Sequence, residues 1–357
     1  MAAGSPDIPA NMPLRFQVGE RTLAAVSRRL VSKGFDLESL LGDAGLQLPP
    51  LPAKADGMML RSLPEAQLGP VSAQAEGLLV YVRQRYPRYY ASLSGTYEEY
   101  LGGFSTKSRA TLKRKVRKFE QLSGGQLDVR AFRTPGEMDI FYTLARAVSQ
   151  KTYQERLLGS GLPEDETFRA AMQKSAERDE ARGYLLFLNG EPVSYLYTPI
   201  QKGCVIYAYL GYDPAIAMHS PGTVLQLEAM ERLFAEQRHR YFDFTEGDGQ
   251  HKRLFSTGCV ECMDVLLLRP TVANRVLITT HRNFHAGVEA LGNVAERYGL
   301  KARLKKWLRG TPSTTEATNG GAALTVAPDT PQSLQGLPAE RRRKGNSGLV
   351  GQEDISN

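Results

Sequence analysis

The chain has 357 residues, of which 41% are hydrophobic, and carries a formal net charge of +7 from 45 Lys and Arg against 38 Asp and Glu. This length supports one large domain or two small ones. No apolar run approaches the roughly 20 residues of a membrane span, and residues 1–11 lack the features of a secretory signal, so we expect no transmembrane segment. Three cysteines cannot all pair within one chain, which favours a reducing, cytoplasmic compartment.

Composition divides the chain into four regions. Residues 1–76 are an irregular and helical N-terminal region with a predicted helix over 21–33, and residues 77–269 alternate strand and helix signals as one domain. Residues 270–309 are predicted to be helical, and their basic amphipathic end either docks on the domain or makes a peripheral membrane contact. Residues 310–357 contain no aromatic residue and are rich in Ser, Thr, Gly and Pro, which predicts a disordered tail.

The central region begins with a strand-like run and a helix with one apolar face. The helix is predicted over 106–122 because Leu112, Val116 and Phe119 recur at helical spacing. Asn189-Gly190 predicts a hairpin between two strands further along. The other predicted elements are strands at 77–82, 126–133, 184–188, 192–199, 204–212, 240–245 and 259–268, and helices at 135–150, 164–182 and 223–237. This order predicts an α/β fold, a mixed sheet covered by helices.

A strand, a loop and a helix suited to an anion follow one another in the segment 209–252. The loop Ser220-Pro221-Gly222 leads into a helix that starts near Thr223, and backbone N–H groups at such a helix start bind phosphates. The same pattern is also that of an ordinary strand-to-helix turn, and a Pro-Gly pair alone does not decide between them.

Acid–base side chains gather directly after the strand 240–245. Glu246, Asp248, His251 and Lys252 are interleaved with two glycines there. Carboxylates, an imidazole and an ammonium in one short run suit acid–base catalysis. The alternative is a solvated glycine-rich loop in which Asp243 caps a neighbour.

Two further patterns have a functional and a structural interpretation. The helix from Lys107 carries seven Lys and Arg before its first acid, Glu120, and such a face either grips CoA phosphates, tRNA or an acidic polymer or is simply solvated. Cys259 and Cys262 lie three apart in a predicted strand and therefore point to opposite faces. Because no second cysteine pair completes a ligand set, we expect no metal site.

The order of these motifs resembles the CelD/FemAB-like branch of the GNAT superfamily. The motifs are the basic helix, then Gly-Tyr-Asp-Pro (211–214), Ser-Pro-Gly (220–222) and Asp-Phe-x-x-Gly-x-x-x-x-Lys (243–252). The resemblance, which spans about 94–268, implies a GNAT fold in which the strand 204–211 splays from the strand 240–245 around a thioester. Two departures stand out. Residues 218–223 lack the usual Gln/Arg-x-x-Gly-x-Gly/Ala phosphate loop, and residues 1–76 are short for the first of two GNAT-like units.

The resemblance implies an acyltransferase that moves an acyl group from acyl-CoA, for instance acetyl-CoA, to an amine on a sugar, peptide or other small acceptor, as in polysaccharide or cell-envelope biosynthesis. The alternatives are FemAB-like aminoacyl transfer from tRNA and a degenerate GNAT module that only binds. We expect Glu246 as general base with His251 as its competitor, Tyr209 as proton donor to the leaving thiolate, and Asp243 in a lesser, orienting role. The residues expected to bind the cofactor are His219, Ser220, Gly222, Thr223 and Lys252, and those expected to bind the substrate are Arg109, Arg114 and Asp213.

Overall fold

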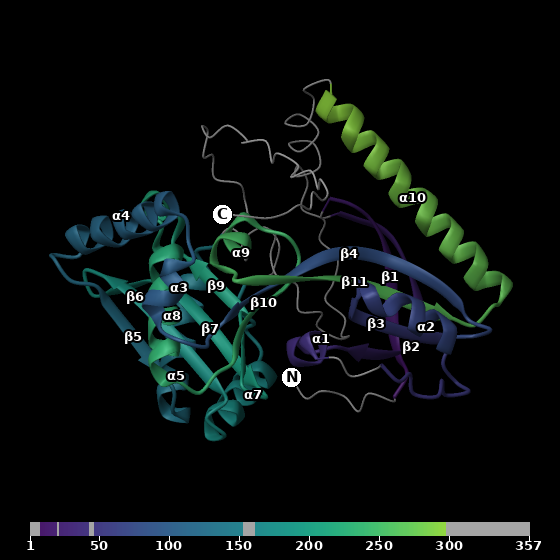
Figure 1. Cartoon of the computed structure of the whole chain (residues 1–357), viewed down its shortest axis with the longest axis horizontal. Coiled ribbons are helices and arrows are strands. Elements are labelled where there is room, and N and C mark those ends of the chain that lie inside the picture. The colour runs from purple at the N-terminus through teal and green to yellow at the C-terminus, as the bar shows by residue number, and fades with distance from the viewer. Residues whose placement is uncertain (1–7, 20, 43–45, 153–160, 298–357) are drawn as a thin grey trace, which may run out of the picture.

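The computed structural model describes residues 8–19, 21–42, 46–152 and 161–297, and its strands form one twisted mixed sheet (Figure 1). Within the described residues, eleven strands run in the order β1-β2-β3-β11-β4-β10-β8-β7-β6-β5, with β9 paired beside β7. The N-terminal half of the sheet consists of β1 (Ala10–Val18), β2 (Arg21–Gly34), β3 (Gly57–Pro64), β4 (Leu79–Ser92) and the last strand, β11 (Gly258–Leu268). The long strand β4 joins this half to the other by pairing with β10.

The second half of the sheet follows the predicted strand and helix order. Its strands are β5 (Asp128–Phe132), β6 (Ala181–Leu188), β7 (Glu191–Gln201), β8 (Cys204–Ile206), β9 (Tyr209–Tyr212) and β10 (Tyr241–Glu246). The predicted hairpin is confirmed, because Asn189 and Gly190 both take positive φ between β6 and β7, as the tight turn of a twisted hairpin requires. The predicted mixed sheet covered by helices is confirmed as well.

Helices cover both faces of the sheet. One face of the second half is covered by α3 (Tyr97–Gly102), α4 (Thr106–Leu122), α8 (Pro221–Glu236) and α9 (Gln250–Phe255), and the other by α5 (Pro135–Ser149) and α7 (Glu166–Glu177). The N-terminal half carries α1 (Leu37–Leu41), α2 (Leu68–Gln74) and, against β1, α10 (Val272–Arg297) (Figure 1). The short 3₁₀ segments are η1 (Glu65–Gln67) and η2 (Pro214–His219).

Local sequence signals explain where the main helices begin. Ser105 caps α4 by accepting the Ser108 N–H, and Thr134 and Glu137 form a capping box ahead of Pro135 in α5. Leu112 and Phe119, on the predicted apolar face, are buried in the core beneath α4. The predicted bounds of this helix, 106–122, are therefore confirmed.

The predicted helix over 21–33 is wrong, because these residues form the strand β2. Their Ala, Leu and Arg content favours a helix locally, but β2 pairs antiparallel with β1 from Arg21 to Leu30 and parallel with β3 from Leu30 to Gly34. Tertiary pairing of this kind overrides weak local propensity. The predicted disordered tail, 310–357, and the amphipathic helix over 296–309, apart from its first two residues, lie outside the described residues.

None of the described helices has the apolar length that a membrane crossing requires, including α10 with its 26 residues.

Candidate functional site

A split in the sheet separates β9 from β10. The short strand β8 pairs parallel with β10, from Cys204 opposite Tyr241 to Ile206 opposite Asp243, and one further bond joins the Tyr207 N–H to the Asp243 carbonyl at 2.9 Å. Beyond that point β9 pairs only with β7 among the described strands. The splay that the resemblance implies is therefore present, and it leaves a gap in the main-chain pairing beside the last residues of β10.

The backbone of β10 turns away at this point for a local reason. Thr245 takes a positive φ of 63°, which is an outlier for a β-branched residue, and its N–H donates to Asp243 Oδ1 at 2.8 Å. The pairing of β10 with β4 on the other side shifts register at the same place. The Asp243 side chain thus accepts the N–H of Thr245, two residues past the end of the pairing between β10 and β8. Strained backbone of this kind is concentrated at functional sites.

Asp243 is a structural anchor of the split. Its carboxylate is 1% exposed and accepts from Arg88 at 2.5 and 3.2 Å, in addition to the Thr245 N–H. Arg88 also donates to the Phe35 carbonyl at 2.7 Å. With both oxygens engaged by charge-assisted bonds, this carboxylate orients its neighbours and is unavailable as a base, which agrees with the lesser role expected for it.

An aromatic wall encloses His251 on one side of the split. The Tyr207 ring centroid lies 5.8 Å from those of both Phe244 and His251, and the Phe255 ring lies 4.8 Å from His251. His251 Nε2 is buried and has no hydrogen-bond partner among the described residues. Burial, together with the charges of Lys252 and Lys115, lowers the pKa of His251 to about 4, so the imidazole is neutral near pH 7 and able to accept a proton.

Glu246 faces a different set of side chains. Its electrostatic neighbours are Tyr86, Asp264, Arg61 and Arg83, which belong to β3, β4 and β11. Burial, followed by the charge of Asp264, raises the pKa of the Glu246 carboxyl. The ring neighbours of His251 come instead from the break after β8, from β10 and from α9, so the two candidate bases face different sides of the site.

Lys252 is held by the main chain. Its side chain is buried, and Nζ donates to the backbone carbonyl of Glu246 at 2.6 Å. The ammonium therefore fixes the turn between β10 and α9. Its predicted role in binding a cofactor stays a prediction.

The N-terminus of α8 offers few donors to an anion. The Ser220 N–H donates to the Ala217 carbonyl and the Thr223 N–H to the Ser220 carbonyl, while Pro221 has no N–H. Within the described part of the chain, Gly222 alone in this turn has an N–H without a backbone partner. The phosphate site stays a prediction, and the turn uses the N–H groups of Ser220 and Thr223 in its own 3₁₀ bonds.

Gly222 is buried against β9. A Cβ atom at this position would lie 2.9 Å from Leu210 Cδ2 and 3.3 Å from Tyr212 Cδ1. A side chain at this position would displace Leu210 and Tyr212 in the packing of α8 on β9, whether or not a ligand approaches.

Gly222→Val is consequently expected to lower the free energy of unfolding by about 1–3 kcal/mol, as overpacked sites do. Urea denaturation measures this. Gly136 offers a matched control, since it also follows a proline at a helix start and a Cβ there meets nothing within 4 Å. Equal stability of Gly222→Val and Gly136→Val would contradict the packing argument.

The other predicted residues lie around this centre. Tyr209 packs on the side of α7, with its ring 5.5 Å from Phe168, whereas Tyr207 lies beside His251. Asp213 caps η2 through the Ala215 N–H at 2.9 Å and pairs with Lys151 at 3.2 Å. His219 ends η2 and is partly exposed. Arg109 and Arg114 lie on α4, where Arg109 is partly exposed and Arg114 is exposed.

Tyr207 is the aromatic residue that the sequence-based prediction missed. The pattern over 204–212 predicts one continuous strand, but the strand breaks at Tyr207 and Ala208 between β8 and β9. The break allows β8 to follow β10 while β9 follows β7. The sequence gives no signal for it, because its cause is the pairing partner on each side.

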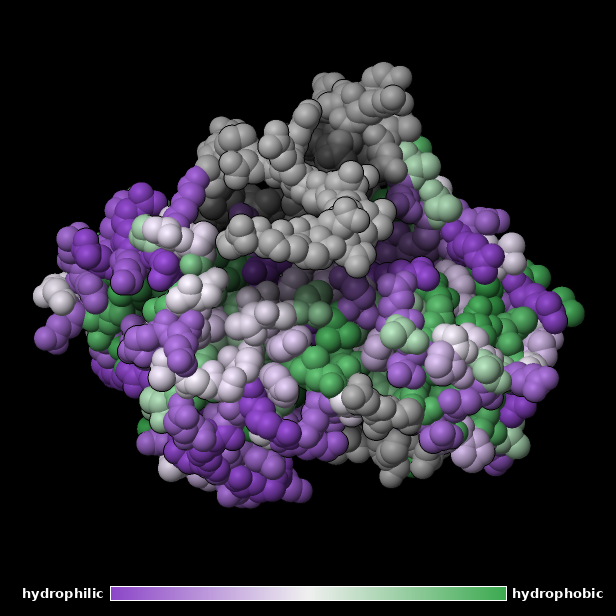
Figure 2. All heavy atoms as spheres, viewed as in Figure 1, coloured by the Kyte–Doolittle hydropathy of each residue, from purple (hydrophilic) through white to green (hydrophobic). Residues whose placement is uncertain are grey.

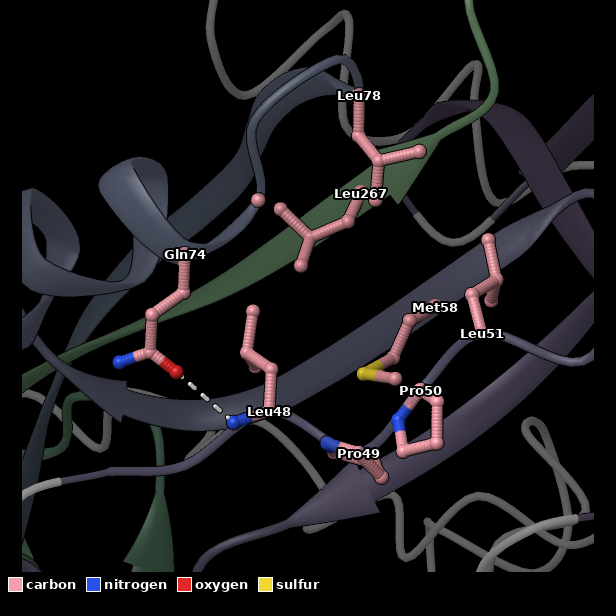
Figure 3. A pocket seen from close by; sticks show the side chains of 9 residues that line it. Leu48, Pro49, Pro50, Leu51, Met58, Gln74, Leu78 and Leu267 are labelled. Atoms are coloured by element: carbon pink, nitrogen blue, oxygen red, sulfur yellow. Dashed lines mark hydrogen bonds between the residues drawn. The ribbon is translucent and has the colours of Figure 1, made fainter.

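A separate apolar pocket lies in the N-terminal half of the molecule (Figure 3). It has a volume of about 350 Å³ and lies between the loop at Leu48 to Leu51, β3 and β11. Its one polar side chain, Gln74, is engaged with the Leu48 N–H at 3.0 Å and the Leu46 carbonyl at 2.6 Å. The pocket therefore brings no acid–base group to a ligand.

The cysteines behave as predicted from their spacing. Cys259 is exposed and Cys262 is buried, which places them on opposite faces of β11. No group of three His, Cys, Asp or Glu side chains that could hold a metal ion occurs among the described residues.

Comparisons with known proteins find one family model and several solved structures to which parts of this chain are similar. Residues 106–253 match the family model of the acetyltransferase (GNAT) domain, whereas no curated protein matches. Among solved structures, similar chains include FemX (12% identity, 72% of this chain and 88% of that chain covered, TM-score 0.46) and L-PGS from Bacillus licheniformis (15%, 63% and 72%, 0.42). A conserved protein from Bacteroides thetaiotaomicron is also similar (14%, 59% and 70%, 0.44). At these identities the likeness concerns the fold alone.

Proposed function

We propose that the protein transfers an acyl group from acyl-CoA to an amine, because residues 106–253 match the family model of the acetyltransferase (GNAT) domain. The observation that carries the proposal is the split between β9 and β10, which opens beside a helix N-terminus, that of α8. A thioester lying in this gap would run along the main chain of β10, with its acyl carbon beside the last residues of the strand.

The reaction needs one proton acceptor and one proton donor. The amine nitrogen attacks the thioester carbon, the C–S bond breaks and an amide forms. A base takes the proton from the amine nitrogen, and the thiolate takes a proton as it leaves. Main-chain donors along the gap would stabilise the charge on the thioester oxygen in the transition state.

Glu246 serves as the base for an amine that approaches from β3, β4 and β11. Its raised pKa suits proton acceptance near neutral pH. His251 serves an amine that approaches from the side of α8 and α9, where its buried Nε2 is unpartnered. Tyr207, whose ring lies beside that of His251, replaces Tyr209 as the proposed proton donor to the thiolate on that side.

A second candidate donor, aminoacyl-tRNA, is favoured by the surface of α4. This helix carries seven Lys and Arg, and no ion pair involves any of them among the described residues. Figure 2 shows hydrophilic residues gathered over α4 at the left edge of the molecule. A polyanionic donor would neutralise this surface. The turn before α8 has few free N–H groups, and this weakens the case for a CoA pyrophosphate there.

The test compares the two donors on the purified full chain. The expected result is binding of acetyl-CoA by titration calorimetry and release of free CoA thiol only when an amine acceptor is added. Binding of aminoacyl-tRNA without binding of acetyl-CoA, falling steeply with salt, would replace the first donor by the second. If a folded protein binds neither donor, the transferase proposal is wrong and a domain that only binds other ligands is left.

A further inference from the structure

The carboxylate of Asp264 is buried where β3, β4 and β11 meet, and neutral groups bind it. Its residue is 2% exposed. Oδ1 accepts from the Tyr86 hydroxyl at 2.9 Å and from the Ser62 N–H at 3.2 Å, and Oδ2 accepts from Gln84 Nε2 at 2.8 Å. Three donors on two oxygens is the bonding pattern of an ionised carboxylate. All three donors are uncharged, so they leave its negative charge to act on the groups around it.

The backbone is irregular on every strand that contributes to this place. The pairing of β11 shifts register at Asp264 against both β3 and β4, and the pairing of β10 with β4 shifts just before Glu246. On β3, Ser62 takes a left-handed φ of 55°, which is uncommon for a residue with a Cβ atom. Bulges and strained residues re-aim side chains next to functional sites. The irregular backbone therefore marks this polar cluster as more than a chance contact between strands.

The Tyr86 hydroxyl has no proton left for Glu246. A phenol has one proton to donate, and this proton goes to Asp264. The Ser62 N–H donates to the Tyr86 oxygen at 3.0 Å, and the Ser62 hydroxyl, 2.9 Å away, donates to it as well because the Tyr86 proton is already used. Burial, followed by the charge of Asp264, raises the pKa of Tyr86, so the phenol keeps its proton. Glu246 lies within hydrogen-bond reach of the same hydroxyl but receives nothing from it while Asp264 holds the proton.

The charges around Glu246 act in opposite directions. Burial and the charge of Asp264 raise the pKa of Glu246, while Arg61 and Arg83 lower it, and the net shift is upward. The titratable groups that face Glu246 from the neighbouring elements are Arg61 of β3, Arg83, Tyr86 and Arg88 of β4, Asp264 of β11 and Lys252 of α9. Arg88 is bound by Asp243. Asp264 is thus the one carboxylate among these groups that opposes the cations.

We infer that Asp264 is a positioning residue for acyl transfer: it holds the proton of Tyr86 away from Glu246 and so keeps the Glu246 carboxylate free to accept the proton of the attacking amine. This inference rests on the proposed function, with Glu246 as the base. In the step, the N–H bond of the amine breaks, its proton moves to a Glu246 oxygen, and the nitrogen electron pair forms the bond to the acyl carbon. Asp264 and Tyr86 exchange no proton.

Asp264→Asn tests the inference with the smallest change of shape. The asparagine oxygen still accepts from Tyr86 and Ser62, and a flipped Gln84 amide accepts from the new N–H₂ group. The variant removes the negative charge, and it holds the Tyr86 proton less firmly because bonds to neutral acceptors are weaker than bonds to carboxylates. Both changes stabilise the ionised form of Glu246. The acidic limb of kcat/KM is therefore expected to move to lower pH by about one pH unit, the size that follows from one hydrogen bond to a charged group.

Two measurements are made on the full chain. The first is the ¹³C NMR titration of the Glu246 carboxyl in the folded protein without substrate, with its resonance identified by its loss in Glu246→Gln. The second is the pH profile of kcat/KM with acetyl-CoA and an amine acceptor. Glu261→Gln is the matched control, because it removes the same charge from an exposed position on the same strand and should shift neither curve.

Tyr86→Phe separates the route through the hydroxyl from the charge of Asp264 alone. Without the hydroxyl there is no proton to release toward Glu246, so Asp264→Asn should shift the Glu246 titration less in the Tyr86→Phe background than in wild type. Equal shifts in both backgrounds would show that Tyr86 plays no part, and the inference would be wrong.

The two measurements distinguish failure of the inference from failure of the proposed function. If Glu246 titrates at the same pH in wild type and in Asp264→Asn, the inference is wrong, whether or not the protein transfers acyl groups. It is also wrong if the titration shifts while the acidic limb of an active enzyme stays in place. If the titration shifts but wild type transfers no acyl group, the proposed function fails and the control of Glu246 by Asp264 stands.

Discussion

Asp243→Ala is expected to lower the free energy of unfolding by about 3–5 kcal/mol, because it leaves the charge of Arg88 buried and unpaired. The two side chains are 1% and 11% exposed, with an N–O distance of 2.5 Å. The substitution also frees the Thr245 N–H, which Asp243 holds at 2.8 Å. Both losses fall at the point where β10 separates from β9, so the variant should disturb the split as well as the stability.

Urea denaturation with an unchanged m value measures the effect. Asp248→Ala is the control, since Asp248 forms an exposed pair with Arg253 at 3.0 Å, and exposed pairs contribute little. The double variant Arg88→Met, Asp243→Ala should recover part of the lost stability, because no buried charge is then left without a partner. A loss below about 1 kcal/mol in Asp243→Ala would contradict the assignment of Asp243 as a buried anchor.

Local signals in the sequence predicted the elements that local chemistry determines. The helix over 106–122 was predictable from Leu112, Val116 and Phe119, since one apolar stripe and a serine cap are sufficient to place it. The turn at Asn189-Gly190 was predictable because both residues tolerate positive φ. Even the faces of Cys259 and Cys262 followed from strand periodicity.

Features that depend on distant partners could not be predicted in this way. The segment 21–34 is a strand because β1 and β3 pair with it, and its own composition favours a helix. The strand β4 extends past 82 through charged residues because β10 and β11 flank it on both sides. The break at Tyr207 likewise arises from competition between two pairing partners, so the sequence pointed to Tyr209 and missed its neighbour.

The candidate site was predictable in its residue types and only partly in its geometry. Clustering at and after the end of β10 identified Glu246, His251 and Lys252, all of which are at least partly buried. The sequence could not show that Lys252 binds the Glu246 carbonyl, or that Glu246 and His251 face different elements. Alternation along a strand predicts faces only until a register shift, and β10 has such a shift between Asp243 and Glu246.

Substitution of the true general base is expected to reduce the rate by about 10²–10⁴-fold, and the pair Glu246→Gln and His251→Gln decides which residue that is. A base acts only when deprotonated, so kcat/KM must fall as the pH drops through its pKa. Burial and the charge of Asp264 raise the pKa of Glu246, which places its acidic limb above the ordinary carboxyl range. The pKa of His251 is lowered to about 4, which places its acidic limb below the ordinary range of an imidazole.

If Glu246 is the base, Glu246→Gln loses both rate and acidic limb, while His251→Gln retains both. If instead His251→Gln loses both rate and acidic limb, and kcat/KM of the wild type falls only near pH 4, His251 is the base. The amine then approaches from the side of α8 and α9. Glu261→Gln, an exposed carboxylate on β11, is the control for a general loss of negative charge and should leave the profile unchanged. Near-normal turnover in both single variants would show that neither side chain takes the proton. The split would then act by positioning an amine that is already neutral, because holding the two reactants in line lowers the barrier without proton transfer to the protein.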